Sequence, residues 1–162
     1  MKRIVSIQDI SDIGKCSLTA ALPVISAMGV ECAVLPTAVL SAHSQFEGFT
    51  FRDLTDDIPG ICAHWEREGL DFSAVYTGYL ASARQVDVVR GFFDDFGKDA
   101  KIIVDPAMAD FGRLYSGFDA DFPREMARLC EGADIILPNI TEACLLLGME
   151  YREEYDREYI RS

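Results

Sequence analysis

The sequence lacks most of the features that mark secreted, membrane and metal-binding proteins. It contains only two histidines, and its five cysteines form no C-x-x-C pair, so it shows no zinc-site pattern. The cysteines are odd in number and mostly have apolar neighbours, which is typical of reduced thiols in the cytosol. No run of apolar residues resembles a signal peptide or approaches the length of a membrane span. We therefore expect a cytoplasmic protein that does not bind a membrane.

Positive charge is also scarce. The chain has 15 Lys and Arg against 27 Asp and Glu, which gives a formal net charge of −12 at pH 7. The basic residues are scattered along the chain and form no long cluster. A nucleic-acid backbone is negatively charged throughout and would be repelled by such a protein. We expect no nucleic-acid partner.

Internal repeats, low-complexity stretches and linkers are absent, so we expect one domain over residues 1–162. Hydrophobic residues make up 49% of the chain, enough for one sizeable core. Short β-branched or apolar runs alternate with segments of helical period, which predicts an α/β fold with a mainly parallel central sheet flanked by helices. The predicted strands cover residues 3–8, 31–36, 73–77, 101–104 and 134–137. The predicted helices cover residues 15–28, 54–68, 86–96, 122–129 and 140–147.

Two segments depart from this alternation. Residues 37–51 combine Ser, His, Gln, Glu, Gly and Phe without a helical stripe, which predicts a small flap that leaves the main sheet after the second strand. Near the other end, Tyr151, Tyr155 and Tyr159 recur at four-residue intervals among charged residues. This spacing predicts the beginning of an amphipathic helix.

The glycine-rich nucleotide-binding motifs are missing from the turn where they would be expected. The turn after the first strand leads through Gly14 and Lys15 into a helix, as a P-loop does. A P-loop, however, needs a glycine where Asp9 stands and a Ser or Thr where Cys16 stands. No G-x-G-x-x-G occurs either. We interpret the turn as an ordinary helix start.

Carboxylates are plentiful where two later strands end. Asp105 and Asp110 follow the fourth predicted strand, and Glu142 follows the fifth. Carboxylates gathered at strand ends hold Mg²⁺ directly or through water, and the metal then neutralises nucleotide phosphates. The alternative is that Asp105 and Asn139 cap the following segments, with Glu142 completing a capping box. Because the carboxylates occur together in two neighbouring loops, we favour the functional interpretation over the capping one.

Five segments in this order and spacing resemble the pyridoxal/pyridoxamine (vitamin B6) kinases of the ribokinase-like superfamily, over their N-terminal portion. They are residues 4–8 with the turn that follows, 41–44, 76–79, 105–115 and 137–143. The resemblance covers essentially the whole chain. It implies a ribokinase-like fold, with the C-terminal part of that fold absent here.

The resemblance also implies a vitamer-binding side. Asp9 or Ser11, together with the flap residue Ser44, would face the pyridine ring and pair with its nitrogen or its 3-hydroxyl. Tyr79 would stack on the ring or lie against its edge. His43 is a further flap candidate.

On the phosphate side, the resemblance implies that Asp110 and Glu142 hold Mg²⁺ and that Asn139 and Glu142 approach the triphosphate of ATP. Asp105 corresponds to the carboxylate that serves the family's monovalent cation, K⁺ or Na⁺, and belongs to the same metal region. Tyr115 would lie on the lid over the nucleotide or the substrate. The expected ligands are a B6 vitamer and MgATP, and the full-length protein is expected to be a homodimer.

Three positions depart from the family pattern. Asp9 replaces the commoner serine, Ser44 replaces threonine, and Ala109 replaces the glycine before Asp110. The first two lie at vitamer contacts, so the choice among pyridoxal, pyridoxamine, pyridoxine and hydroxymethylpyrimidine stays open.

The chain also lacks the later G-x-G-D segment of the family, whose backbone N–H groups form an anion hole and whose Asp is the general base. We therefore expect an ATP-dependent B6-vitamer kinase, acting on the 5′-hydroxymethyl group, that is inactive as this chain alone. One alternative is a hydroxymethylpyrimidine kinase of the same superfamily. The other is a non-catalytic protein that binds a vitamer or associates with a partner.

Overall fold

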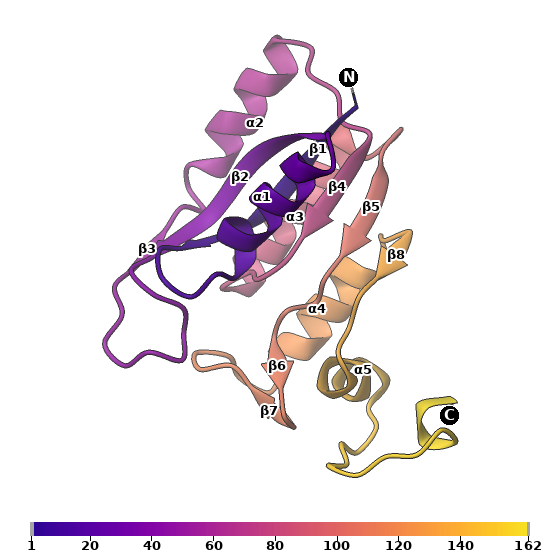
Figure 1. The fold of residues 1–162 in the computed structure, drawn as a ribbon. Coiled ribbons are helices and arrows are strands. Elements are labelled where there is room, and N and C mark those ends of the chain that lie inside the picture. The colour runs from indigo at the N-terminus through magenta and orange to yellow at the C-terminus, as the bar shows by residue number, and fades with distance from the viewer. Residues whose placement is uncertain (1, 162) are drawn as a thin grey trace.

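The computed structural model describes residues 2–161, and these form one main sheet and one small hairpin (Figure 1). The main-sheet strands are β1 Arg3–Ser11, β2 Glu31–Leu40, β3 Phe51–Asp53, β4 Ala74–Thr77, β5 Lys101–Val104 and β8 Ile135–Ile136. They lie in the order β3-β2-β1-β4-β5-β8, with β3 antiparallel to its neighbour and the other pairs parallel. The separate hairpin pairs β6 Ala109–Asp110 with β7 Arg113–Leu114. The predicted α/β fold with a mainly parallel sheet is confirmed.

Helices cover both faces of the sheet. They are α1 Ser17–Ala27, α2 Ile58–Arg67, α3 Ala83–Phe96, α4 Phe122–Cys130 and α5 Ile140–Leu147. In Figure 1, α1 lies in front of β1 and β2, while α2, α3 and α4 lie behind the sheet. Helix α5 lies below the sheet, beside the β6–β7 hairpin. This arrangement leaves the carboxyl ends of the strands facing the flap, the hairpin and the start of α5.

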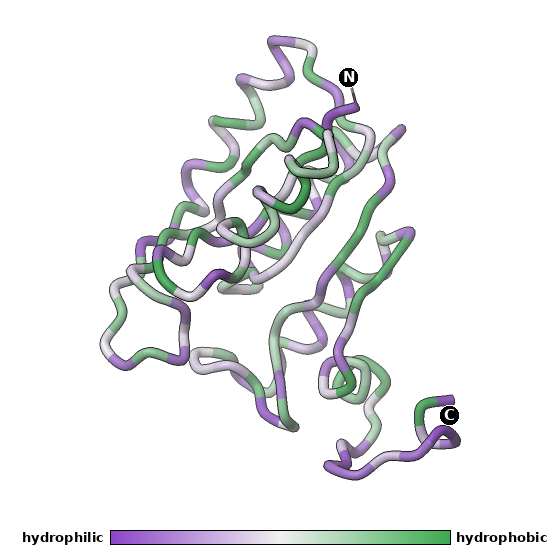
Figure 2. Tube along the Cα trace, in the orientation of Figure 1, coloured by the Kyte–Doolittle hydropathy of each residue, from purple (hydrophilic) through white to green (hydrophobic). Residues whose placement is uncertain are grey.

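The hydrophobic core lies between the sheet and the helices behind it. Figure 2 shows the trace mostly hydrophobic along β5 and β8. Helices α2 and α3, with the loop between α2 and β4, contribute an aromatic cluster of Trp65, Phe72, Phe92 and Phe96 whose ring centroids lie 4.6–6.4 Å apart. Burial of each such side chain stabilises the fold by roughly 1.5–3 kcal/mol. This packing fixes the positions at which the strands end.

The flap is shorter than the predicted segment 37–51. Strand β2 continues through Leu40, and the chain returns as β3, so the flap proper spans residues 41–50. Backbone and side-chain hydrogen bonds between Ser41 and Thr50 close its base, at 3.1 and 2.9 Å. The prediction missed this extension because Val39 and Leu40 pair with β1 beyond a register shift, a long-range contact with no local signal.

The predicted tyrosine-bearing helix is wrong. Gly148 ends α5 in a left-handed conformation, with φ of 66°, and only a short 3-10 turn, Tyr159–Arg161, follows. The Tyr159 hydroxyl donates to the carbonyl of Glu150 at 2.7 Å and lies 3.0 Å from the Cys144 sulfur. The segment therefore folds back on α5 because its tyrosine finds partners there.

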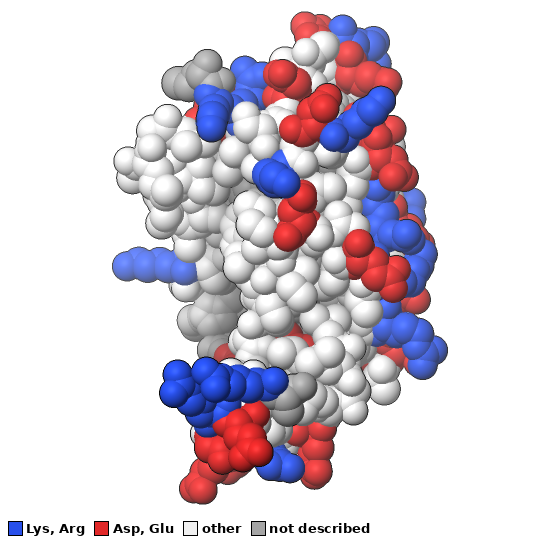
Figure 3. Space-filling view, turned by 90° about the vertical axis from the view of Figure 1, so that its right-hand side faces the viewer, with Lys and Arg blue, Asp and Glu red and all other residues white. Residues whose placement is uncertain are grey.

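The face at the β8 edge of the sheet is poor in charge. Figure 3 shows this side, with a broad uncharged area in the middle and acidic and basic side chains interspersed near its margins. Ile135, Ile136 and Leu137 are 45–51% exposed along this edge. Apolar side chains of β8 therefore reach the surface. No helix within residues 2–161 has the length and apolar character needed to cross a membrane.

Candidate functional site

A pocket of about 880 Å³ is lined by α1, the flap and the sheet, and it extends along β1, β4 and β5 to the carboxyl ends of these strands. In open parallel sheets this is where ligands bind, since strand ends and helix starts present free polar groups there. Most of the residues predicted for the site line this one cavity. They are Asp9, Ser11, His43, Ser44, Tyr79, Asp105, Asp110 and Tyr115.

The β1 side of the pocket carries a buried carboxylate. Asp9 is 3% exposed and accepts a hydrogen bond from the Ser11 hydroxyl at 2.8 Å. Asp9 lies where β1 shifts register against β2, between Gln8 and Ile10, and Ser11 pairs with Leu40 just beyond the shift. Burial, and next the charge of Asp9, raise the pKa of the Tyr79 phenol. Asp9 can therefore accept a hydrogen bond from a cationic or N–H group of a ligand lying against Tyr79.

The flap is packed onto the first turn. The His43 amide donates to the carbonyl of Ile13 at 3.0 Å, and the Gln45 amide donates to Nδ1 of His43 at 3.3 Å. Because Nδ1 accepts, the imidazole proton is assigned to Nε2. Gly14 has a φ of 131°, and a Cβ there would lie 2.0 Å from the His43 ring. The glycine is therefore what lets the flap imidazole lie over the turn.

Several lining residues were not singled out as site residues by sequence reasoning, among them Gln8, Tyr76 and Gly78. Gln8 and Tyr76 lie on adjacent strands and point to the same face, and their side chains are hydrogen-bonded to each other. A Cβ on Gly78 would lie 2.8 Å from the Gln8 side chain. The two-residue alternation along the first and third predicted strands was the available signal, because it places Gln8 and Tyr76 on one face.

The acidic side of the pocket is strained electrostatically. Burial raises the pKa of Asp105 to about 6, and within residues 2–161 its carboxylate makes no hydrogen bond or ion pair. Burial, and then the charges of Glu142, Asp110 and Asp105, raise the pKa of Tyr115 to about 12. Asp105 and Tyr115 are thus poorly solvated, and the charges of Asp110 and Glu142 lie nearby. A cation in this region would stabilise all three carboxylates.

Asn139 and Glu142 do not line the pocket. Asn139 caps α5 by accepting from the Glu142 amide at 2.9 Å, and Glu142 accepts from the Asn139 amide at 2.8 Å. The second Glu142 oxygen accepts from the Met108 amide at 3.2 Å, and the Asn139 side chain donates to the carbonyl of Ala109 at 2.8 Å. The capping box given as the alternative interpretation is therefore present. Both residues fasten the β6–β7 hairpin to α5.

The described residues hold no preassembled metal site. No group of three His, Cys, Asp or Glu side chains within residues 2–161 is arranged to hold a metal ion. Asp110 is exposed and accepts from the Phe111 amide, while both Glu142 oxygens already accept from backbone N–H groups. The half-buried Asp105 carboxylate, unpaired within residues 2–161, still fits a cation, since it has free lone pairs and an unfavourable environment. The assignment of Asp105, Asp110 and Glu142 to metal stays a prediction.

A comparison with protein families gives a match over most of the chain. The family described as phosphomethylpyrimidine kinase matches residues 16–161. These residues include both the flap and the acidic side of the pocket.

Individual relatives of this chain are likewise described as kinases. The Saccharomyces cerevisiae protein named "Putative pyridoxal kinase BUD17" is 30% identical over 93% of this chain and 50% of its own length. A Bacteroides thetaiotaomicron protein described as a "putative phosphomethylpyrimidine kinase", crystallised with pyridoxal, is 44% identical, with a TM-score of 0.94 over 99% of this chain and 56% of that one. Pyridoxal kinase from Lactobacillus plantarum is 37% identical, with a TM-score of 0.89 over 99% and 58%. The chain thus spans about half the length of these relatives.

Proposed function

The chain belongs to the phosphomethylpyrimidine kinase family, and on that premise we propose that it forms the vitamer-binding part of an ATP-dependent kinase. The substrate proposed is a B6 vitamer, pyridoxal, pyridoxamine or pyridoxine. The reaction transfers the γ-phosphoryl group of ATP to the 5′-hydroxymethyl oxygen, whose proton goes to a general base.

One observation carries the proposal: a buried carboxylate and a tyrosine line the same pocket, and the pocket has a suitable size. Asp9 is 3% exposed and Tyr79 lines the same cavity. A pyridine ring against Tyr79 would present its nitrogen as an N–H⁺ donor to Asp9, a charge-assisted pair in a poorly solvated site. The 44% identical Bacteroides protein was crystallised with pyridoxal, which supports the same ligand here.

The acidic side supports the metal and nucleotide part of the proposal. Asp105 and Asp110 would hold Mg²⁺, with a K⁺ or Na⁺ ion beside Asp105. Glu142 would bind the same Mg²⁺ through a water molecule. Mg²⁺ bound there would neutralise phosphate charge during transfer. Asn139 and Glu142 position this region by holding the hairpin on α5, and Tyr115 covers it.

The described residues bind and orient rather than complete the transfer. A G-x-G-D segment has no counterpart among the 162 residues. Positioning and electrostatic stabilisation provide nearly all of the catalysis in phosphoryl transfer. We therefore propose that these residues alone bind the vitamer without turning it over. The cysteine pattern supports a cytoplasmic location, and we propose a homodimer for the assembled protein, which analytical ultracentrifugation tests.

Calorimetry of the purified chain with separate vitamers tests the proposal. We expect pyridoxal, pyridoxamine or pyridoxine to bind, and a coupled assay with MgATP to show no turnover. Turnover by these 162 residues would contradict the proposal that they bind the vitamer without catalysing the transfer. Failure of all three vitamers to bind would contradict the proposed substrate class.

A second candidate is a hydroxymethylpyrimidine kinase, which the description of the matching family favours. Its substrate also carries a hydroxymethyl group on a nitrogen heterocycle. Titration with hydroxymethylpyrimidine beside the vitamers separates the two, because the better ligand identifies the ring that Asp9 and Tyr79 fit. A protein that binds a vitamer but has no kinase activity even when full length would be the third candidate.

A further inference from the structure

A glutamine side chain is completely buried near the start of α3. Gln85 is 0% exposed, and it follows Ser82, which caps the helix by accepting from the Gln85 amide at 3.2 Å. The neighbouring inward residues Val86 and Val89 are apolar. A buried amide costs free energy unless its polar atoms are paired. The partners of Gln85 therefore indicate what the residue does.

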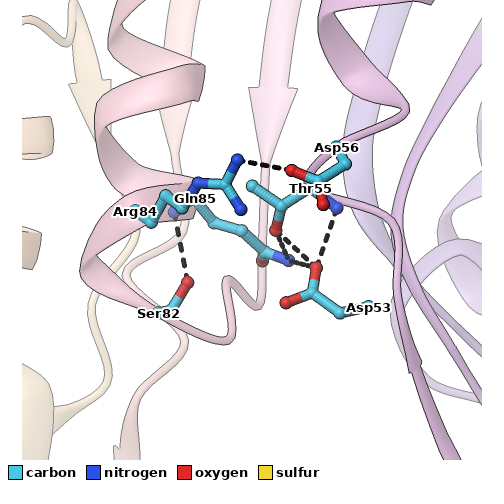
Figure 4. Close-up of polar contacts among 6 residues, drawn as sticks. All are labelled: Asp53, Thr55, Asp56, Ser82, Arg84 and Gln85. Atoms are coloured by element: carbon cyan, nitrogen blue, oxygen red, sulfur yellow. Dashed lines mark hydrogen bonds and ion pairs between the residues drawn. The ribbon is translucent and has the colours of Figure 1, made fainter.

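Those partners come from three separate segments, and Figure 4 shows the contacts to Asp53 and Thr55. The Gln85 Nε2 group donates to the carbonyl of Thr37 at 3.0 Å, to Oδ1 of Asp53 at 3.1 Å and to the Thr55 hydroxyl at 2.9 Å. Two protons serve three acceptors, so one of the bonds is shared. The Gln85 Oε1 accepts from the Ala81 amide at 2.8 Å.

These partners lie at the base of the candidate site. Thr37 belongs to β2 and Asp53 to β3, the two strands from which flap 41–50 extends. Ala81 is two residues after Tyr79, and the Thr37 hydroxyl donates to the Tyr79 carbonyl at 3.4 Å. One buried amide thus joins both roots of the flap to the segment that carries the pocket tyrosine.

Hydrogen bonds, rather than the ion pair nearby, make this connection. Although burial opposes the shift, hydrogen bonds from Thr55 and Gln85 hold the pKa of Asp53 below its ordinary value. Arg84 forms an ion pair with Asp56 beside this cluster, but both side chains are well exposed, and exposed pairs contribute little. The buried Gln85 amide is therefore the main polar link between α3 and the flap.

We propose that Gln85 is a positioning residue for vitamer binding, which sets the flap and Tyr79 at their working separation across the pocket. The proposal rests on the proposed function, because it assumes that this pocket takes the vitamer. Gln85 acts through Thr37, Asp53 and Ala81, and it does not line the pocket itself.

Hydrogen exchange of the ligand-free chain tests the link without any ligand. Gln85→Glu keeps the shape but places a carboxylate against Asp53, and Gln85→Met removes the polar atoms. We expect amide exchange in residues 41–50 and 79–81 to rise about tenfold in both variants, while the second half of α3 stays protected. Val89→Ala, a cavity-forming change on the same helix, is the control and should leave exchange in these segments unchanged relative to the rest of the sheet.

A double variant that exchanges the amide and the carboxylate between positions 85 and 53 tests whether binding can be restored. When Gln85→Glu is combined with Asp53→Asn, the amide introduced on β3 can donate to the carboxylate introduced on α3, which restores one bond with its direction reversed. Pyridoxal affinity, measured by calorimetry, should fall about tenfold in Gln85→Glu and recover by about threefold or more in the double variant. Val89→Ala should lower the melting temperature without changing affinity.

The outcomes separate the two proposals. Unchanged flap exchange in both Gln85 variants, or an affinity loss in Val89→Ala equal to that in Gln85→Glu, would overturn the positioning role. If the unaltered chain bound no vitamer, the proposed function would fall, while the exchange data would still decide whether Gln85 holds the flap.

Discussion

The two sides of the pocket use their polar groups in opposite ways. On the flap side, the Asp9 carboxylate has Ser11 as its one hydrogen-bond partner within residues 2–161, and Asp9 lines the cavity. On the hairpin side, Glu142 gives both oxygens to backbone N–H groups. Similar carboxylates at similar strand ends thus differ in how far the protein's own groups satisfy them. We propose that the carboxylate with unsatisfied oxygens is the one that contacts a ligand.

This difference explains why motif reasoning treated both sides alike. A sequence shows that a carboxylate follows a strand, but it does not show how many N–H groups already point at that carboxylate. Substitutions at Glu142, Asp9, Asp105 and Ser44 test the contrast, and their expected effects decrease in that order.

The strongest response is expected on the hairpin side. Glu142→Ala leaves the Met108 and Asn139 amides without their acceptor in a buried place and should lower the free energy of unfolding by about 3 kcal/mol. Urea denaturation measures it. Glu131→Ala, at an exposed position, is the control and should change stability by less than about 0.5 kcal/mol. Equal losses in both variants would remove the structural role assigned to Glu142.

The flap side should respond in ligand binding rather than in stability. Asp9→Asn keeps an acceptor for Ser11 but loses the charge, so pyridoxal affinity should fall about 10–30-fold with little change in unfolding. Calorimetry at fixed pH measures the affinity, and Asp12→Asn, an exposed neighbour, is the matched control. If Asp9→Asn unfolded the protein without weakening binding per folded molecule, the two sides would not differ as described.

Asp105 belongs to the hairpin side, yet its carboxylate makes no hydrogen bond or ion pair in the part of the chain that the structure describes, so it tests the contrast from within. Since burial raises its pKa from 3.8 to about 6, the neutral acid favours folding below about pH 4, and this stabilisation is lost as the pH rises through 6. Asp105→Asn should therefore raise stability at pH 7 by about 1–2 kcal/mol, allowing for partial solvation. It should also flatten the dependence of stability on pH between about 4 and 6.

Melting curves across that pH range provide the measurement, and Asp99→Asn, at an exposed position, should leave the pH dependence intact. A destabilising Asp105→Asn at neutral pH would show that the carboxylate has a favourable partner after all. In that case Asp105 would resemble Glu142 rather than Asp9.

The weakest response is expected at Ser44. Its side chain lines the pocket and makes no hydrogen bond within the described residues, so Ser44→Ala should change the free energy of unfolding by less than about 0.5 kcal/mol. A few-fold loss of pyridoxal affinity is expected if the hydroxyl meets the ring. Equal affinity for the variant and the unaltered chain would remove Ser44 from the vitamer side.

Local signals predicted the parts of the fold that depend on neighbours in sequence. Strand β5 and helix α5 have the predicted bounds, and the Asn139–Glu142 capping box has its usual three-residue spacing. The extension of β2 to Leu40 and the partners of Gln85 depend on contacts across the sheet, so periodicity shows neither. The tyrosine repeat after Gly148 has helical spacing, but the Tyr159 hydroxyl has a partner on α5, and tertiary contacts decided its conformation.

The hydrogen bonds of Gln85 also order the events of folding. The bond to Thr37 spans 48 residues, and those to Asp53 and Thr55 span 32 and 30. Such distant contacts require large loops to close, and loop closure slows the formation of topologically remote pairs. We therefore expect the flap to reach its final position late, after α3 has docked on the sheet. The pocket would then form last, and binding of a vitamer would depend on the completed packing of α3.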